Sequence, residues 1–247
     1  MQFLSFHGII RYNLKGADEL DNRKKYFLMI DVESTNGFKA PLVYDVGVAI
    51  TDRKGVIYEK RSFLIKEVFK NERLMSTAYY KEKVPSYERE LSKGLHELVS
   101  WSYAVSEIRK MAVKWNAVKV AAYNLQFDKG AMACTNDFLG GGTKVLKGTK
   151  IKEEVCIWAL SCQTIFLQKN FNLTAVQENW LTEAGNMKTS AEIAYRYITG
   201  KHDFIEEHKG LADVEIEAEI MAHCFRQKKK IQKGIIPHPW RIPNKRL

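Results

Sequence analysis

The chain has 247 residues, 45% of them hydrophobic, and carries a formal net charge of +10 with a pI of about 9.3. This allows a sizeable core, and the basic excess favours an anionic partner, with nucleic acid first. No apolar run approaches the roughly 20 residues of a membrane span, and the first residues lack the features of a signal peptide. The spacing of the four cysteines fits neither a zinc finger nor a disulfide scaffold, which indicates reduced thiols in a cytoplasmic protein.

Apolar runs separated by turn residues predict three strands early in the chain. Residues 1–25 are mixed and are interpreted as an N-terminal extension that packs on the domain. Residues 26–30 have the length of a buried strand, and a second strand is expected over 43–51. Asp52-Arg53-Lys54-Gly55 is typical of a hairpin turn into a third strand over 56–65. These strands predict an antiparallel sheet edge built around the first of them.

The rest of residues 26–226 is expected to complete a single domain. Residues 66–100 are interpreted as a partly helical insertion. Helices are predicted from Ala104 to Trp115, over 153–168, from a capping box at Thr189-Ser190-Ala191-Glu192 to Gly200, and from Leu211 to Phe225, with a buried strand over 118–123.

A basic tail, residues 227–247, follows the domain. From Arg226 onward the chain holds eight Lys or Arg residues, three of the five prolines and no acidic residue. Such a tail could follow a phosphate backbone or dock on the domain, and the sequence favours neither.

Two acids end the first predicted strand. Because side chains alternate along a strand, Asp31 and Glu33 point the same way while Val32 points into the core. Two carboxylates side by side at a strand end form half of a site for a hard cation.

Two further segments place polar residues beside apolar elements. Asn124 and Asp128 follow the strand predicted over 118–123 and can reach one site, although a turn with a helix-capping Asp explains the same residues. Asp213 lies near the start of the last helix and His208 precedes it. A surface or core histidine is the alternative for His208.

Four carboxylates that converge need cations nearby. At about 4 Å and an effective dielectric constant near 20, each like-charged pair costs about 4 kcal/mol. Oxygen ligands favour Mg²⁺ or Mn²⁺ over zinc, and two such ions about 3.5–4 Å apart suit phosphodiester cleavage. A histidine, with a reference pKa of about 6.5, suits removal of a proton from the attacking water.

The arrangement resembles the DEDD exonuclease superfamily, which has the ribonuclease H-like fold and includes epsilon proofreading subunits, ribonuclease T and oligoribonuclease. The motif D-x-E-S/T-T stands here as Asp31-Val32-Glu33-Ser34-Thr35, and N-x-x-F-D stands as Asn124-Leu125-Gln126-Phe127-Asp128. The third motif, H-x(4)-D, runs from His208 to Asp213. Histidine in this motif is typical of the DEDDh, or DnaQ-like, branch.

The resemblance implies an α/β fold with a mixed five-stranded sheet and helices on both sides. It also implies two Mg²⁺ or Mn²⁺ ions and release of nucleoside 5′-monophosphates from single-stranded 3′ ends, with DNA favoured. No membrane is expected, and a polymerase or replication partner is left open. By this resemblance the metal ligands are Asp31, Glu33, Asp128 and Asp213, the general base is His208, and the substrate-binding residues are Thr35, Phe38, Asn124 and Phe127.

Parts of the chain depart from the family pattern. Tyr123 stands where a histidine is frequent, and residues 64–100 and the basic tail have no clear counterpart. Residues 183–207 make a longer lead into the third motif than compact members have. These departures would suit a phage or bacterial relative with its own substrate.

Two other functions fit the sequence. The first is a nucleic-acid-binding module on the same fold without catalysis, which the presence of all five motif residues disfavours. The second is an exoribonuclease or oligoribonuclease-like enzyme of the same family. Aromatic side chains could stack on bases, but packing is the simpler explanation for each of Phe38, Tyr79, Tyr80, Tyr87 and Trp101.

Overall fold

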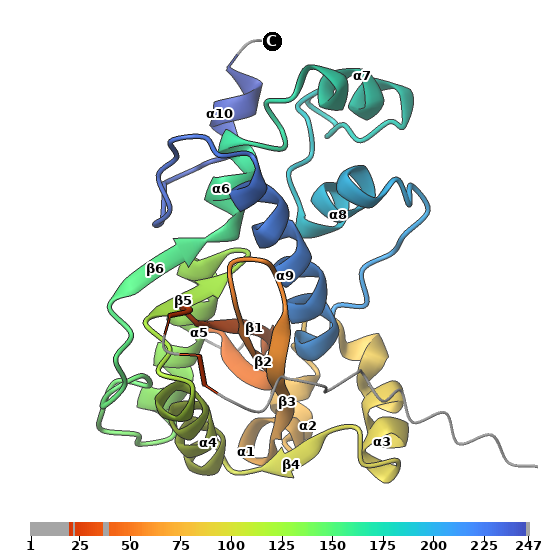
Figure 1. Ribbon diagram of the computed structural model, residues 1–247. Helices are drawn as coiled ribbons and strands as arrows, with labels where there is room; N and C mark the ends of the chain where they lie inside the picture. The colour runs from red at the N-terminus through yellow and green to blue at the C-terminus, as the bar shows by residue number, and fades with distance from the viewer. Residues whose placement is uncertain (1–19, 22, 37–39, 246–247) are drawn as a thin grey trace, which may run out of the picture.

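Six strands form one mixed sheet in the order β4-β3-β2-β1-β5-β6 (Figure 1). The computed structural model describes residues 20, 21, 23–36 and 40–245. The strands are β1 (Phe27–Thr35), β2 (Leu42–Thr51), β3 (Ile57–Ile65), β4 (Glu97–Val99), β5 (Lys119–Ala122) and β6 (Glu153–Cys156). The helices are α1 (Lys66–Phe69), α2 (Glu72–Met75), η1 (Lys81–Lys83), α3 (Val84–Ser92), α4 (Trp101–Lys114), α5 (Leu125–Phe138), α6 (Ile157–Gln163), α7 (Lys169–Gln177), α8 (Ala191–Thr199), α9 (Gly210–Arg226) and α10 (Arg241–Asn244).

The central strand β1 pairs antiparallel with β2 and parallel with β5. β3 continues the antiparallel side, and β6 continues the parallel side. These five strands form the mixed sheet that the family resemblance implies, although the residue pattern predicted a helix where β6 lies. The sixth strand was not predicted: β4 comes from the insertion and pairs parallel with β3 at the sheet edge.

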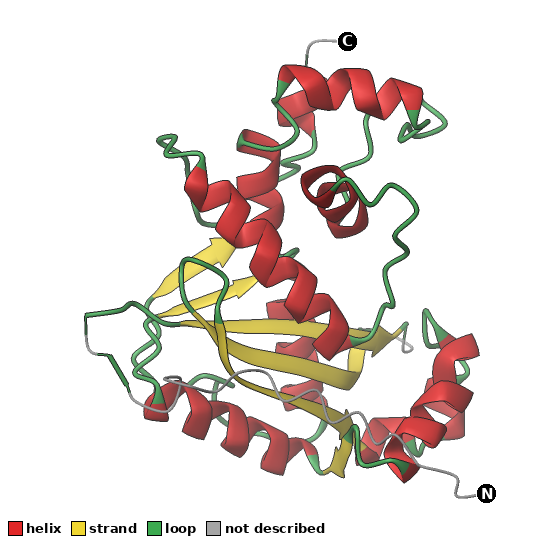
Figure 2. Cartoon of the chain, turned by 45° about the vertical axis from the view of Figure 1, so that its right-hand side comes forward, coloured by secondary structure: helices red, strands yellow, loops and turns green. Residues whose placement is uncertain are grey.

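Helices cover both faces of the sheet, and the long helix α9 crosses one of them (Figure 1; Figure 2). Side-chain alternation along β1 decides which residues meet which layer. Leu28, Ile30 and Val32 pack in the cluster that contains the buried residues of α4 and α5. Phe27 and Met29 pack in the cluster that contains those of α9. Asp31 and Glu33 continue the second series, so the same alternation directs them toward α9.

The predicted helix over 153–168 is wrong in its first part. Residues 153–156 form β6, because Val155 and Cys156 extend the sheet against Ala121 and Ala122 and are buried there. The helix of this region, α6, begins only at Ile157. The capping box is shifted by one residue, since Ser190 rather than Thr189 caps α8 by accepting a hydrogen bond from the Ile193 N–H.

The described part of the basic tail packs on the domain. Ile231 and Ile242 contact one core cluster, and Ile235 and Ile236 contact the other. The backbone N–H of Cys156 donates to the Lys233 carbonyl at 2.8 Å, which attaches the tail beside β6. Docking, one of the two alternatives for this tail, is therefore observed. Most of the predicted N-terminal extension, residues 1–19 and 22, lies outside the described residues.

The four cysteines are free thiols, and three of them are buried in the core. This agrees with the interpretation of the four cysteines as free thiols rather than a disulfide scaffold. Across the described ranges, no helix has both the length and the apolar character needed to cross a membrane.

Candidate active site

The free edge of β1 opens the candidate site. β5 pairs with β1 only as far as Met29, and among the described residues no strand continues the pairing on this side at Ile30–Glu33. The Val32 N–H donates instead to the Asp128 Oδ1 at 3.2 Å. Asp31 and Glu33 flank this contact, and the Asp31 Oδ2 is buried without a hydrogen-bond partner among the described residues.

Asp128 reaches the site from the first turn of α5, which begins directly after Asn124. Its side chain is buried. The alternative of a capping Asp does not apply, because this carboxylate bonds to β1 and the side chain of Asn124 makes no capping hydrogen bond. Asp128 thus links the α5 N-terminus to the strand that carries the first two acids.

Two glycines let the start of α9 touch the backbone of β2. A Cβ atom on Gly47 would lie 1.9 Å from the Gly210 carbonyl carbon, and one on Gly210 would lie 2.4 Å from the Gly47 nitrogen. Any side chain at either position would therefore push the helix away from the sheet. This close approach sets the positions of His208 and Asp213, which flank Gly210.

A buried carboxylate, Asp45, fixes the same helix start. Its Oδ2 accepts hydrogen bonds from the Gly210 N–H at 3.0 Å and from the Tyr87 hydroxyl at 2.7 Å. The Glu90 side chain joins this anchor from α3, because it contacts both His96 and Lys209. The insertion thereby helps to hold the α9 N-terminus in place.

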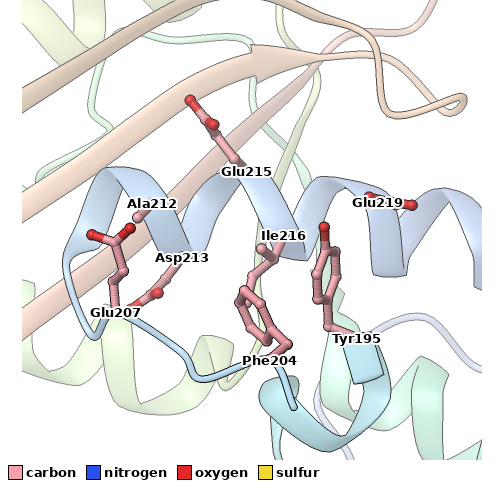
Figure 3. A pocket seen from close by; sticks show the side chains of 8 residues that line it. All are labelled: Tyr195, Phe204, Glu207, Ala212, Asp213, Glu215, Ile216 and Glu219. Carbon is pink, nitrogen blue, oxygen red and sulfur yellow. The ribbon is translucent and has the colours of Figure 1, made fainter. Parts of the chain in front are cut away.

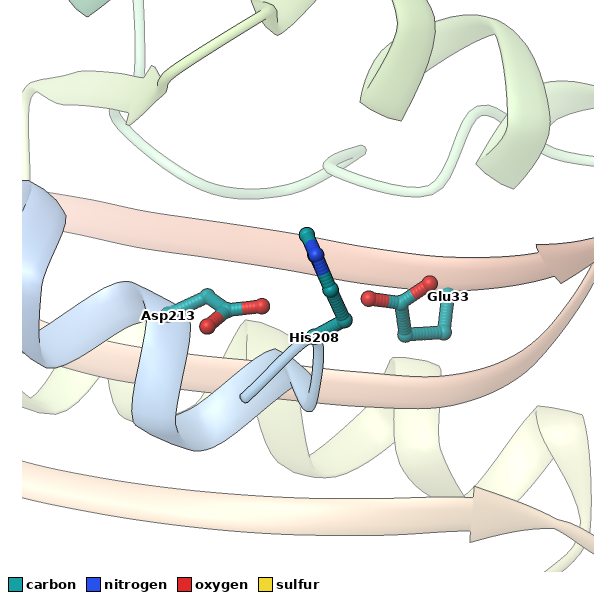
Figure 4. A group of neighbouring side chains, drawn as sticks. All are labelled: Glu33, His208 and Asp213. Carbon is teal, nitrogen blue, oxygen red and sulfur yellow. The ribbon is translucent and has the colours of Figure 1, made fainter. Parts of the chain in front are cut away.

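Glu33, His208 and Asp213 converge from β1 and the start of α9. One ligand atom of each lies within 4.8 Å of the others. Figure 4 shows the Glu33 and Asp213 carboxylates pointing toward one another, with the His208 ring between them. This arrangement can hold a cation, or a water molecule, between two carboxylates and an imidazole.

A cavity of about 390 Å³ joins these residues to the rest of the cluster. Each predicted catalytic residue contributes to its lining, and so do Asn124 and Phe127 among the predicted substrate-binding residues. Phe127 is 45% exposed, which leaves its ring free to contact a ligand. Three segments far apart in the sequence are thus brought to one hollow.

The two remaining predicted substrate-binding residues are Thr35 and Phe38. Thr35 is fully buried at the end of β1 and does not line the cavity, where Ser34 and Asn36 are found instead. Phe38 lies outside the described residues. Contact of either residue with a substrate stays a prediction.

Sequence reasoning missed Glu217, a further carboxylate of the cluster. It lies one helical turn after Asp213 on α9, is 1% exposed and lines the same cavity. Its Oε2 is buried without a hydrogen-bond partner in the described part of the chain. The spacing of four residues from Asp213 was the available signal, because residues at i and i+4 share one face of a helix.

The insertion also contributes to the cavity through Tyr79 and Tyr80. The Tyr80 ring stacks on His208 with ring centroids 4.2 Å apart and planes 10° apart. Packing, the simpler explanation for the aromatic residues, holds for Tyr87 and Trp101, which are buried in the core. It does not describe Tyr79, whose side chain is 70% exposed.

Burial and mutual repulsion make the carboxylates of the cluster hard to ionise. Burial raises the pKa of Glu33 to about 9, with a further rise from Asp213. Burial likewise raises the pKa of Asp213 to about 8 and that of Asp128 to about 7. The pKa values of Asp31 and Glu217 are raised well above their ordinary range by burial first and by neighbouring carboxylates second. A positive charge inside the cavity would relieve this cost.

The pKa of the His208 imidazole shifts in the opposite direction, and its neutral form is again the favoured one. Burial lowers the pKa of His208, and the ammonium group of Lys83 lowers it further. His208 is therefore neutral at pH 7 and able to accept a proton.

A second cavity, of about 350 Å³, lies between α9 and the segment that follows α8 (Figure 3). Its lining includes Glu207, Glu215 and Glu219 beside Asp213. Of the five predicted catalytic residues, only Asp213 lines this second cavity, so it is not the place where the three motifs meet.

No protein-family model and no curated protein sequence matches this chain. Its structure is similar to that of Escherichia coli exonuclease I in complex with a 5cy-dT13 oligonucleotide, with 15% identity and a TM-score of 0.54. That match covers 83% of this chain and 41% of the exonuclease chain, so the chain spans less than half of its neighbour's length. An ExoI/SSB-Ct complex matches at 14% identity and a TM-score of 0.53, over 88% and 43% of the two chains.

These similarities concern the fold. The sheet with helices on both faces is the ribonuclease H-like fold seen in exonuclease structures, as the sequence predicts.

Proposed function

We propose that this chain is a metal-dependent 3′→5′ exonuclease that releases nucleoside 5′-monophosphates. The observation that carries the proposal is the convergence of Asp31, Glu33, Asp128 and Asp213 with His208 around one cavity. Residues 26–226 would form the catalytic domain, which contains the insertion near 66–100. The basic tail over 227–247 would follow this domain. The fold shared with exonuclease I supports this class of reaction.

The donor set of the cavity fits hard divalent cations. Its ligand atoms are carboxylate oxygens with one imidazole nearby, which suits Mg²⁺ or Mn²⁺. The Asp31 Oδ2 and the Glu217 Oε2 are buried without hydrogen-bond partners within the described residues, a costly state that a cation would relieve. The residues that would hold two such ions are Asp31, Glu33, Asp128 and Asp213, with Glu217 as an additional ligand.

Divalent ions held there would neutralise the carboxylates and polarise the scissile phosphate. The chain's own residues supply the remaining functions. His208, neutral and next to Glu33 and Asp213, would take the proton from the attacking water. Asn124 and the exposed ring of Phe127 line the cavity where the terminal nucleotide would lie.

Single-stranded DNA is the proposed substrate, and RNA is the alternative. The net charge of +10 favours a polyanion, and similar folds are found in exonuclease I complexes with oligonucleotides. An enzyme that distinguishes RNA from DNA does so through contacts near the 2′-hydroxyl.

The test is digestion of single-stranded DNA and RNA labelled at the 3′ or the 5′ end, with Mg²⁺ and with EDTA. We expect 3′-labelled substrates to release labelled mononucleotide at once and 5′-labelled substrates to shorten stepwise. Asp213→Asn should reduce the rate by at least about 100-fold, as removal of a metal ligand does. The matched control is Asp137→Asn, an exposed acid on α5. A rate unaffected by EDTA, or equal in the two variants, would contradict the proposal.

A further inference from the structure

Residues 77–83 of the insertion reach the candidate site from outside the sheet. The Asn36 N–H donates to the Thr77 carbonyl at 3.0 Å, and Ala78 forms an antiparallel bridge with Thr35. These contacts attach the segment to the end of β1, two residues beyond Glu33. The attachment delivers the next residues of the segment, Tyr79 and Tyr80, to the cavity lining.

The His208 imidazole stacks on the Tyr80 ring. The two rings are nearly parallel, 10° apart, with centroids 4.2 Å from one another. Among the residues that the structure describes, His208 makes no side-chain hydrogen bond, and its nearest carboxylate contact, to Glu206, is 4.0 Å long. That distance is too long for a hydrogen bond. Stacking on Tyr80 is therefore the contact that orients this imidazole.

The backbone of His208 needs such support. Its φ angle is +49°, in the left-handed region that non-glycine residues rarely adopt. Residues held in this region cost free energy and persist where their surroundings fix them. Here the helix start at Gly210 fixes one side, and the Tyr80 ring covers the side chain.

Lys83 contacts both the Tyr80 ring and the backbone next to His208. Its ammonium group lies 4.8 Å from the centroid of the Tyr80 ring and donates a hydrogen bond to the Glu207 carbonyl, next to His208 in the chain. The segment thus holds both the tyrosine and the backbone beside the histidine. A hydrogen-bonded carboxylate or carbonyl, which usually orients a catalytic histidine, is replaced here by an aromatic ring.

We propose that Tyr80 is a positioning residue that holds the His208 imidazole over the carboxylate cluster. The inference rests on the proposed function, because it gives His208 the role of the base. It assigns a role in the reaction to the insertion: residues 77–83 complete the site from a part of the chain outside the three motifs.

The kinetic test compares Tyr80→Phe with Tyr80→Leu. Phenylalanine keeps the stacked ring, so we expect kcat within about twofold of wild type. Leucine removes it, and we expect kcat to fall about 10- to 100-fold, as misplacement of a catalytic group by about 1 Å does, with KM within about threefold. Tyr103→Leu is the matched control, because Tyr103 is an exposed tyrosine on α4. Unchanged or increased kcat in Tyr80→Leu would overturn the proposal.

The second measurement separates this inference from the proposed function. The His208 ring protons, assigned by their loss in His208→Ala, should shift downfield in Tyr80→Leu as the ring current of the stacked tyrosine disappears, and should keep their position in Tyr80→Phe. This result requires no nuclease activity. Resonances that are the same in wild type and Tyr80→Leu would show that the stack is absent in solution, whatever the enzyme does. Circular dichroism would verify that all the variants are folded.

Discussion

At the scale of single residues, Glu217 extends the predicted set of acids. It shares a helix face with Asp213. Among the charged groups near Asp31, it has the largest effect in raising the pKa of that carboxyl. A carboxylate this buried, with one oxygen unpartnered within the described chain, is costly unless it meets a cation or a proton. The divalent ions proposed for this cavity offer such a partner.

We expect Glu217→Gln to weaken Mn²⁺ binding by about tenfold, the lower end of the range for losing a supporting ligand. Isothermal titration calorimetry of the metal-free protein measures this affinity directly. Glu219→Gln is the matched control, since Glu219 lies on the same helix but is exposed. Equal Mn²⁺ affinities for Glu217→Gln and wild type would exclude Glu217 from the ligands.

We expect protonation of His208 to cause the fall in rate on the acidic limb of the pH–rate profile. Because burial and Lys83 lower the pKa of this imidazole, it becomes protonated only below its ordinary value of 6.5. With saturating Mg²⁺ to keep the carboxylates ionised, kcat should stay level near neutral pH and fall at lower pH.

Lys83→Gln tests the electrostatic part of that assignment. Removal of the ammonium group favours the imidazolium form, so the acidic limb should move to higher pH. Lys81→Gln, at an exposed position in the same short helix, should leave the limb unchanged. A limb that does not respond to Lys83→Gln would mean that another group controls it.

At the scale of elements, the contact between α9 and β2 positions the third motif. Gly47 and Gly210 leave no room for a Cβ atom, and Asp45 binds the first N–H of the helix. The chemistry at His208 and Asp213 therefore depends on two residues that have no side chain at all.

Gly210→Ala should move the start of α9 and cost at least about 1–3 kcal/mol of unfolding free energy, the usual range for overpacking. Activity should fall with it, since His208 and Asp213 flank the contact. Gly130→Ala, in α5 with open space around the added Cβ, should be neutral or stabilising by up to about 1 kcal/mol. Urea denaturation measures both. Equal stability of the two variants would contradict this account of the helix start.

At the scale of the whole molecule, the buried acids couple folding to pH and to metal. The folded-state pKa values of Glu33, Asp213 and Asp128, about 9, 8 and 7, exceed the ordinary values of 4.5 for Glu and 3.8 for Asp. Groups raised in this way contribute stability that is complete below the unfolded-state pKa and is lost as pH rises through the folded-state pKa.

The Tm of the protein in EDTA should therefore fall as the pH rises from about 6 to about 9. Mg²⁺ binds the ionised carboxylates, so it should raise Tm more at about pH 8.5 than at about pH 6. Differential scanning calorimetry at matched ionic strength measures both effects. A Tm in EDTA that rises over this range, or a Mg²⁺ effect that does not depend on pH, would contradict a site built on buried carboxylates.

The sequence by itself determined the features that depend on short stretches of chain. Apolar runs and turns located β1, β2, β3 and β5, and the period of two along β1 placed Asp31 and Glu33 on one side. Helical spacing identified α4 and α9. Each of these follows from local periodicity, which depends only on residues close together in the sequence. The fold was predicted from the resemblance of the three motifs to those of the DEDD exonuclease superfamily.

The tertiary structure decided what depends on contacts between distant segments. The apolar residues of β6 fit a helix as well as a strand until Ala121 and Ala122 pair with them. The position of Tyr80 in the site depends on how the insertion packs against β1, and no periodicity in that segment encodes this packing. Helical spacing puts Glu217 on the same face of α9 as Asp213, but only the packing of α9 against the sheet brings that face to the cavity. Long-range packing is set by which surfaces fit together across the whole domain, so it becomes visible only when the chain is folded.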